Sequence, residues 1–108
     1  MTNLRTKNVI LSVSGIAADE KEMAVQINGS IIIGRSDVLR HFILRYLRCL
    51  DSIFALLVQN GDIFLSDLNS TNGTFVDGKP VEAGPEVTVP VANGSTIEAG
   101  SVTFVIRW

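Results

Sequence analysis

The sequence predicts an all-β fold in which short strands pack into a sandwich or a barrel. Apolar residues alternate with polar ones over short runs, and Gly, Pro or Asn-Gly steps separate these runs every few residues. No internal repeat or linker divides the 108 residues, and 46% of them are hydrophobic, which is enough to build a core. We therefore expect one domain over residues 1–108.

The first third of the chain predicts three strands. An alternating run over residues 9–13 is followed by a polar stretch over residues 15–21, which predicts a loop. Alternation returns over residues 23–27, and the Asn28-Gly29 step predicts a turn before a β-branched run over residues 30–33. Residues 23–33 thus predict a β-hairpin that delivers Arg35 to a loop.

The segment over residues 36–50 has two interpretations. Its apolar residues recur at helical spacing and Ser36 can act as an N-cap, so an amphipathic helix is one prediction. The other is a short strand over residues 42–45 with loops on either side, because context can override local periodicity. A helix would place Arg40, Arg45 and Arg48 on its outer side.

The second half of the chain returns to strands. Residues 53–59 are apolar on both faces, as in a strand buried between layers, and Asn60-Gly61 predicts a turn into the alternating run over residues 63–66. Further short strands are predicted at residues 74–76, 80–81, 87–89, 95–98 and 102–108.

The stretch from Asp67 to Gly78 concentrates polar turn-forming residues between apolar runs. It is either a set of tight turns or a binding site. Asp67, Asn69 and Thr71 match the first ligand positions of a calcium-binding EF-hand loop, but the glycine and the final glutamate of that loop are missing. We therefore expect no metal site here.

Composition excludes several function classes. A net charge of -2 provides no basic surface for nucleic acid, and the longest apolar run is too short to span a bilayer. Cys49 and His41 are the only residues of their kinds, which leaves no disulfide, no four-cysteine zinc site and no evident catalytic set. We expect a cytoplasmic protein without cofactor or enzymatic activity, and its oligomeric state stays open.

Three groups of residues resemble the forkhead-associated (FHA) domain family. They are Ile33-Gly34-Arg35, the stretch from Gly61 to Gly78 with its Ser70-Thr71-Asn72-Gly73-Thr74 core, and Gly94 to Gly100 followed by a last strand. The resemblance covers roughly residues 9–108. It implies a sandwich of about eleven short, mostly antiparallel strands, with loops at one end that bind a phosphothreonine peptide. It also favours the strand over residues 42–45.

The resemblance assigns a role to each matching residue. Arg35 corresponds to the arginine that pairs with phosphate, a role that suits a guanidinium with several fixed donors. Thr71 corresponds to a hydroxyl donor to the phosphate, Asn72 to a residue that binds the peptide backbone, and Ser70 with Gly73 to the turn that presents them.

One family motif is altered. The Ser-x-x-His that begins the next strand falls on Asp51 to Phe54, so aspartate replaces the serine and Phe54 replaces the histidine. A carboxylate at about 4 Å from phosphate is repelled by several kcal/mol at an effective dielectric of about 20. Ser52, one position on, can supply the missing hydroxyl, and we expect Phe54 to fill the core beneath the loop.

Two functions follow from these residues. One is a non-enzymatic protein-interaction module or scaffold whose phosphate binding is weakened or lost through Asp51. The other is a working phosphothreonine reader that uses Arg35, Ser52, Thr71 and Asn72. In both cases the predicted partner is a protein or a phosphopeptide, with no nucleic acid and no membrane insertion.

Overall fold

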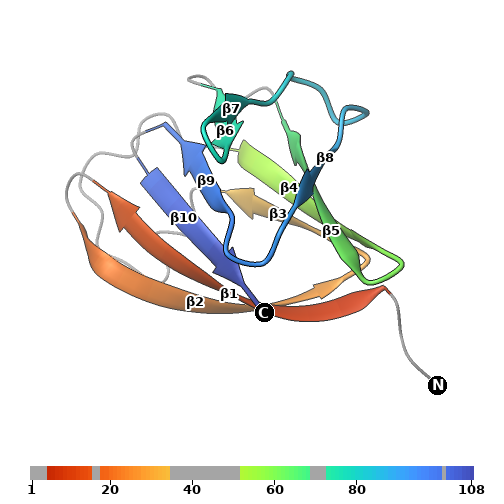
Figure 1. Ribbon diagram of the computed structural model, residues 1–108, viewed down its shortest axis with the longest axis horizontal. Coiled ribbons are helices and arrows are strands. Elements are labelled where there is room, and N and C mark those ends of the chain that lie inside the picture. Colours follow the sequence, from red (N-terminus) through yellow and green to blue (C-terminus); the bar gives the residue numbers. More distant parts are fainter. Residues whose placement is uncertain (1–4, 16–17, 35–51, 69–72, 101) are drawn as a thin grey trace.

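Two antiparallel β-sheets packed face to face make up the computed structural model, which describes residues 5–15, 18–34, 52–68, 73–100 and 102–108 (Figure 1). This arrangement confirms the predicted all-β sandwich. None of the described segments contains a helix long and apolar enough to cross a membrane. Across the same residues, no cluster of three or more His, Cys, Asp or Glu side chains could hold a metal ion.

The larger sheet has six strands in the order β2-β1-β10-β9-β6-β7. Along β10, buried and more exposed side chains alternate, which is the pattern expected when one face of a sheet lies on the core and the other on solvent. The strands are β1 (Thr6–Gly15), β2 (Ala18–Asn28), β6 (Thr74–Val76), β7 (Lys79–Pro80), β9 (Thr96–Ala99) and β10 (Val102–Arg107).

The smaller sheet has four described strands in the order β3-β4-β5-β8. They are β3 (Ser30–Gly34), β4 (Ser52–Gln59), β5 (Asp62–Asp67) and β8 (Val89–Val91). β4 pairs on both sides, and Ala55 on its outward face is only 9% exposed, in agreement with the apolar run predicted there. The strand or helix expected over residues 36–50, and with it an eleventh strand, lies outside the described residues.

The core lies between the two sheets and is closed by aromatic packing. Phe54 of β4 and Phe104 of β10 are both fully buried, and their rings meet edge to face at a centroid distance of 5.3 Å. Since the two strands belong to different sheets, this contact joins the layers at the centre of the molecule. The expectation that Phe54 fills the core is confirmed.

The predicted hairpin over residues 23–33 is wrong, because its two strands lie in different sheets. β2 belongs to the six-stranded sheet and β3 to the four-stranded sheet. Gly29 forms the corner: its N–H donates to the carbonyl of Arg5 at 2.7 Å, and its carbonyl accepts from the N–H of Val58 at 2.9 Å. An Asn-Gly step predicts a tight turn, but long-range backbone bonds decide which strands pair.

The predicted loop over residues 15–21 is also wrong in its second half. β2 starts at Ala18, which pairs with Gly15, and the ladder runs without interruption from Val13 and Lys21 to Thr6 and Asn28. Backbone hydrogen bonds to β1 hold this polar segment extended, and charged residues suit β2 because it is an edge strand.

Several strands near the C-terminus differ from the prediction only in their bounds. β7 ends at Pro80, and β8 covers Val89–Val91 instead of residues 87–89. The hairpin turns are confirmed at Asn60-Gly61 and Asp77-Gly78, where all four residues have positive φ angles as type I′ turns require.

The Phe54 contact leads to a stability prediction. We expect Phe54→Ala to lower the free energy of unfolding by about 3–5 kcal/mol, because it removes a fully buried ring and leaves a cavity between the sheets. Phe75→Ala is the matched control: this ring is 38% exposed, and its loss should cost less than about 1 kcal/mol. Chemical denaturation measures both, and equal losses would contradict a central role for Phe54.

Candidate functional site

The strand ends that flank the predicted site residues gather at one end of the sandwich. In the six-stranded sheet, Thr74 at the start of β6 pairs with Ala99 at the end of β9. In the four-stranded sheet, Ile33, Phe54 and Asp67 pair across β3, β4 and β5. The Thr74 hydroxyl donates to the Asp67 carboxylate at 3.0 Å, which fixes these two sheet ends to each other.

This end is the place where the predicted site residues join the fold. Gly34, which precedes Arg35, pairs with Ser52, the first residue of β4. Ser52 therefore begins a strand, as the resemblance implies. Its side chain lies outside the described residues, as do Arg35, Ser70, Thr71 and Asn72 and the altered position Asp51.

The strand ends that lead to Arg35 and to residues 69–72 lie close to each other. β3 and β5 are separated by β4, so their ends lie about 10 Å apart, or two strand spacings of about 4.8 Å. The chain leaves β3 at Gly34 towards Arg35, and it leaves β5 at Asp67 towards the segment of residues 69–72. A short peptide segment can span this distance.

A buried polar clamp holds the base of the segment of residues 69–72. The side chains of Asp67 and Thr74 are 2% and 1% exposed. The carbonyls of the same two residues accept hydrogen bonds from the N–H groups of Gly84 at 2.9 Å and Val81 at 2.8 Å. Because both side chains and backbone form these bonds, Asp67 and Thr74, which flank the segment, have fixed positions.

Sequence reasoning named Asp67 only as a turn residue or a possible calcium ligand and missed its structural role. A signal was present: Ile63, Leu65 and Asp67 follow each other at period two, which places the aspartate on the face of β5 that packs into the core. A buried carboxylate requires hydrogen-bond donors, and the Thr74 hydroxyl is one that the structure supplies.

A second group of hydrogen bonds, here called the Asp77 latch, lies at the turn after β6. The Asp77 carboxylate accepts hydrogen bonds from the Thr96 N–H and from the Ser95 hydroxyl, both at 2.9 Å. Asp77 also donates its own N–H to the Thr96 carbonyl at 2.8 Å. The Thr96 N–H bond, followed by the Ser95 hydroxyl, lowers the pKa of Asp77 below its ordinary value of 3.8.

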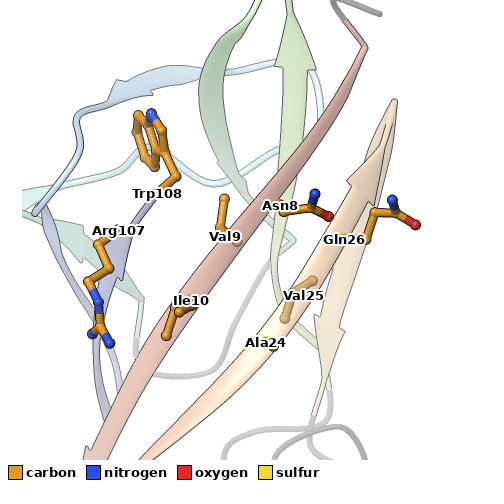
Figure 2. A pocket seen from close by; sticks show the side chains of 8 residues that line it. All are labelled: Asn8, Val9, Ile10, Ala24, Val25, Gln26, Arg107 and Trp108. Atoms are coloured by element: carbon orange, nitrogen blue, oxygen red, sulfur yellow. The ribbon is translucent and has the colours of Figure 1, made fainter.

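A groove of about 620 Å³ lies away from these strand ends, on β1, β2 and β10 (Figure 2). Figure 2 shows Arg107 and Trp108 on one side of it and Asn8 and Gln26 on the other. Arg107 is held by Glu22 at 2.6 Å, and the Lys7 ammonium lies 4.9 Å from the centroid of the Trp108 ring. Sequence reasoning did not single out this groove.

The chain matches a known family and several solved structures. The family model of the FHA domain matches residues 31–100, which is more than half of the chain. A solved domain described for phosphothreonine-dependent FHA domain interactions is 27% identical, with a TM-score of 0.67 and coverage of 94% of this chain and 97% of that one. No curated protein matches the sequence.

Two further solved structures are similar. The FHA domain of FhaA, complexed with the intracellular domain of Rv3910, is 28% identical, with a TM-score of 0.65 and coverage of 92% of this chain and 99% of that one. The FHA domain of the CT664 protein from Chlamydia trachomatis is 19% identical, with a TM-score of 0.70 and coverage of 94% and 98%. At that identity it supports the fold alone.

The clamp predicts a loss of stability on removal of one hydroxyl. Thr74→Val keeps the shape of the side chain but takes a hydrogen-bond donor from the buried Asp67 carboxylate, so the free energy of unfolding should fall by about 1–3 kcal/mol. Thr103→Val, at a half-buried outward position on β10, makes the same chemical change away from the clamp and should cost less. Denaturant titration of both variants tests this, and similar losses would contradict the clamp.

The Asp77 latch predicts a pH dependence. Its lowered pKa means that the folded state favours the charged carboxylate, so this contribution is complete above pH 3.8 and is lost as the pH falls through the lower folded-state pKa. Asp77→Asn keeps a residue that tolerates positive φ. We expect it to destabilise the protein at neutral pH and to make little difference in strong acid, as measured by thermal unfolding across pH.

The control for this measurement is Asp62→Asn, which removes the same charge from an exposed position of β5. A stability difference between Asp77→Asn and the unchanged protein that stays constant from neutral pH into strong acid would show that the carboxylate charge is not the stabilising feature.

Proposed function

This chain belongs to the FHA domain family, and from that premise we propose that it is a non-enzymatic protein-interaction module whose phosphate binding is weakened or lost. The partner is a protein segment that docks on the loops at the Gly34, Ser52 and Asp67 end of the sandwich. This assignment suits a scaffold or signalling component, and we place it in the cytoplasm.

The pairing of Gly34 with Ser52 is the observation that carries the proposal. Paired residues in an antiparallel ladder have Cα atoms about 4.5–5.5 Å apart. Arg35 directly follows Gly34 and Asp51 directly precedes Ser52, so a guanidinium and a carboxylate adjoin the paired ends of two adjacent strands. Within the family's binding scheme, the arginine would bind the phosphate and a serine would stand at position 51.

In this proposal the Asp51 carboxylate and the phosphate of a peptide compete for Arg35. A carboxylate attached this close offers the guanidinium an ion pair within the protein, and a phosphate that approaches must displace it. The same carboxylate repels the phosphate dianion by several kcal/mol at about 4 Å and an effective dielectric of about 20. Micromolar binding amounts to only about 8 kcal/mol, so a penalty of this size can remove it.

The alternative function is a working phosphothreonine reader. The intact run from Ser70 to Thr74 and the clamped base of that segment favour it, as does the 27% identical FHA domain described for phosphothreonine-dependent interactions. In this alternative Ser52 replaces the missing hydroxyl, and Arg35, Thr71 and Asn72 keep the roles that the family gives them.

A titration of the chain with phosphothreonine peptides and their unphosphorylated counterparts distinguishes the two functions. We expect weak binding with little dependence on phosphate, and a gain of at least about tenfold for the phosphorylated peptides in Asp51→Ser, since one charge-assisted hydrogen bond is worth about 1.5–3 kcal/mol. Calorimetry measures the affinity, and NMR amide shifts show whether the peptide contacts this end of the sandwich.

Two controls fix the meaning of the result. Asp62→Ser makes the same chemical change at an exposed position on β5 and should leave peptide binding unchanged. Arg35→Ala should abolish the gain produced by Asp51→Ser. Micromolar, phosphate-dependent binding by the unchanged chain that Arg35→Ala removes would reject weakened binding and establish the reader.

A further inference from the structure

The sequence contains Asn-Gly steps at positions 28, 60, 72 and 93. At such a step the glycine nitrogen can attack the side-chain amide carbon of the asparagine, because glycine has no Cβ to cover that nitrogen. The reaction needs a glycine N–H that is free of hydrogen bonds and an asparagine carboxamide that can turn towards it. The structure describes three of these steps and shows which of them meet the requirements, while Asn72 lies outside the described residues.

At Asn28, hydrogen bonds hold both the glycine N–H and the asparagine carboxamide. The N–H of Gly29 donates to the Arg5 carbonyl at 2.7 Å, and the Asn28 Oδ1 accepts from the Thr6 hydroxyl at 3.0 Å.

The step at Asn93 is held more firmly still. The N–H of Gly94 donates to the Ile106 carbonyl at 2.7 Å. Asn93 binds the backbone of Trp108 twice: its Nδ2 donates to the Trp108 carbonyl at 2.9 Å, and its Oδ1 accepts from the Trp108 N–H at 3.1 Å. At least two hydrogen bonds must open before either protected step can react.

Asn60 is the exception among the described Asn-Gly steps. It lies exposed at the tip of the β4–β5 hairpin, outside the last ladder pair of Gln59 and Asp62. In the part of the chain that the structure describes, neither the Asn60 carboxamide nor the Gly61 N–H has a hydrogen-bond partner. The space where a Cβ of Gly61 would stand is also open, with no atom within 4 Å.

The reaction needs the turn to open, and opening the tip of this hairpin costs little free energy. The φ angles of Asn60 and Gly61, 53° and 83°, are those of a type I′ turn, and Asn60 must rotate about its ψ angle, out of this turn, before the glycine nitrogen reaches the side-chain carbon. The tip, where the Gly61 carbonyl accepts one side-chain bond from Lys7, opens at a lower free energy than the corner at Gly29, whose backbone bonds join it to Arg5 and to Val58 of β4.

We propose that Asn60 is a site of spontaneous deamidation, at which the folded protein converts this asparagine to aspartate and isoaspartate. The Gly61 nitrogen forms a bond to Cγ of Asn60, the Cγ–Nδ2 bond breaks, and Nδ2 leaves as ammonia with the proton given up by Gly61. Water then hydrolyses the succinimide at either carbonyl. One water is consumed, one ammonia is released, and no electrons are transferred.

The product carries a new carboxylate next to two cations. The Lys7 ammonium donates to the Gly61 carbonyl at 2.8 Å, and Arg5 and Asn60 line the same concavity. Deamidation changes the net charge from -2 to -3 and, in the isoaspartate form, lengthens the backbone of a two-residue turn by one carbon. The modified hairpin therefore differs from the original in both charge and shape.

The test is site-resolved peptide mapping of the folded chain during incubation at mildly alkaline pH, with isoaspartate detected by enzymatic methyl labelling. Deamidation at Asn60 should be at least about tenfold faster than at Asn28 or Asn93, because two or more hydrogen bonds must open at the protected steps. Ion-exchange chromatography should resolve the more acidic product.

The matched control is the same chain in denaturant, where the three steps, each an Asn-Gly followed by Ser or Asp, should react at similar rates. A native rate at Asn28 or Asn93 that equals the rate at Asn60 would overturn the proposal. A preference for Asn60 that persists unchanged in denaturant would overturn it too, because the fold would then not be the cause.

Discussion

The buried hydrogen bond between Thr74 and Asp67 is the constraint on which the candidate site depends, at the end of the sandwich where Gly34, Ser52 and Asp67 lie. The chain changes sheets between these residues, from β5 of the smaller sheet to β6 of the larger one. An apolar contact at this point would hold the layers together without fixing one alignment, whereas a carboxylate excluded from water must meet its donor. The clamp thus sets the position from which the segment of residues 69–72 departs.

Local pattern was enough to predict much of the fold. Alternation in β10 reflects one-sided burial, and the turns at Asn60 and Asp77 follow from residues that accept positive φ. Pairing between distant strands was not predictable in this way. The Asn28-Gly29 step has the residues of a hairpin, but bonds from Gly29 to Arg5 and Val58 make it a corner between sheets.

The candidate site was less accessible to sequence reasoning than the fold. The pattern of residues 67–78 marked a candidate region, and the family resemblance named Arg35, Thr71 and Asn72, which lie outside the described residues. The clamp involves Asp67, a residue that was considered only as a turn former or metal ligand. The pairing of Gly34 with Ser52 was not predictable from local pattern, because it joins β3 to β4 across the intervening residues 35–51.

The place of β1 in the larger sheet affects how the chain folds. β1 lies between β2 and β10, and the Arg107 guanidinium binds the hydroxyl of Ser12, which is 95 positions away in the sequence. Half of the ladder of β1 is therefore missing until β10 has been synthesised, and Leu11 and Val13 cannot reach their fully buried state before then. Folding dominated by such distant contacts takes on the order of milliseconds to seconds.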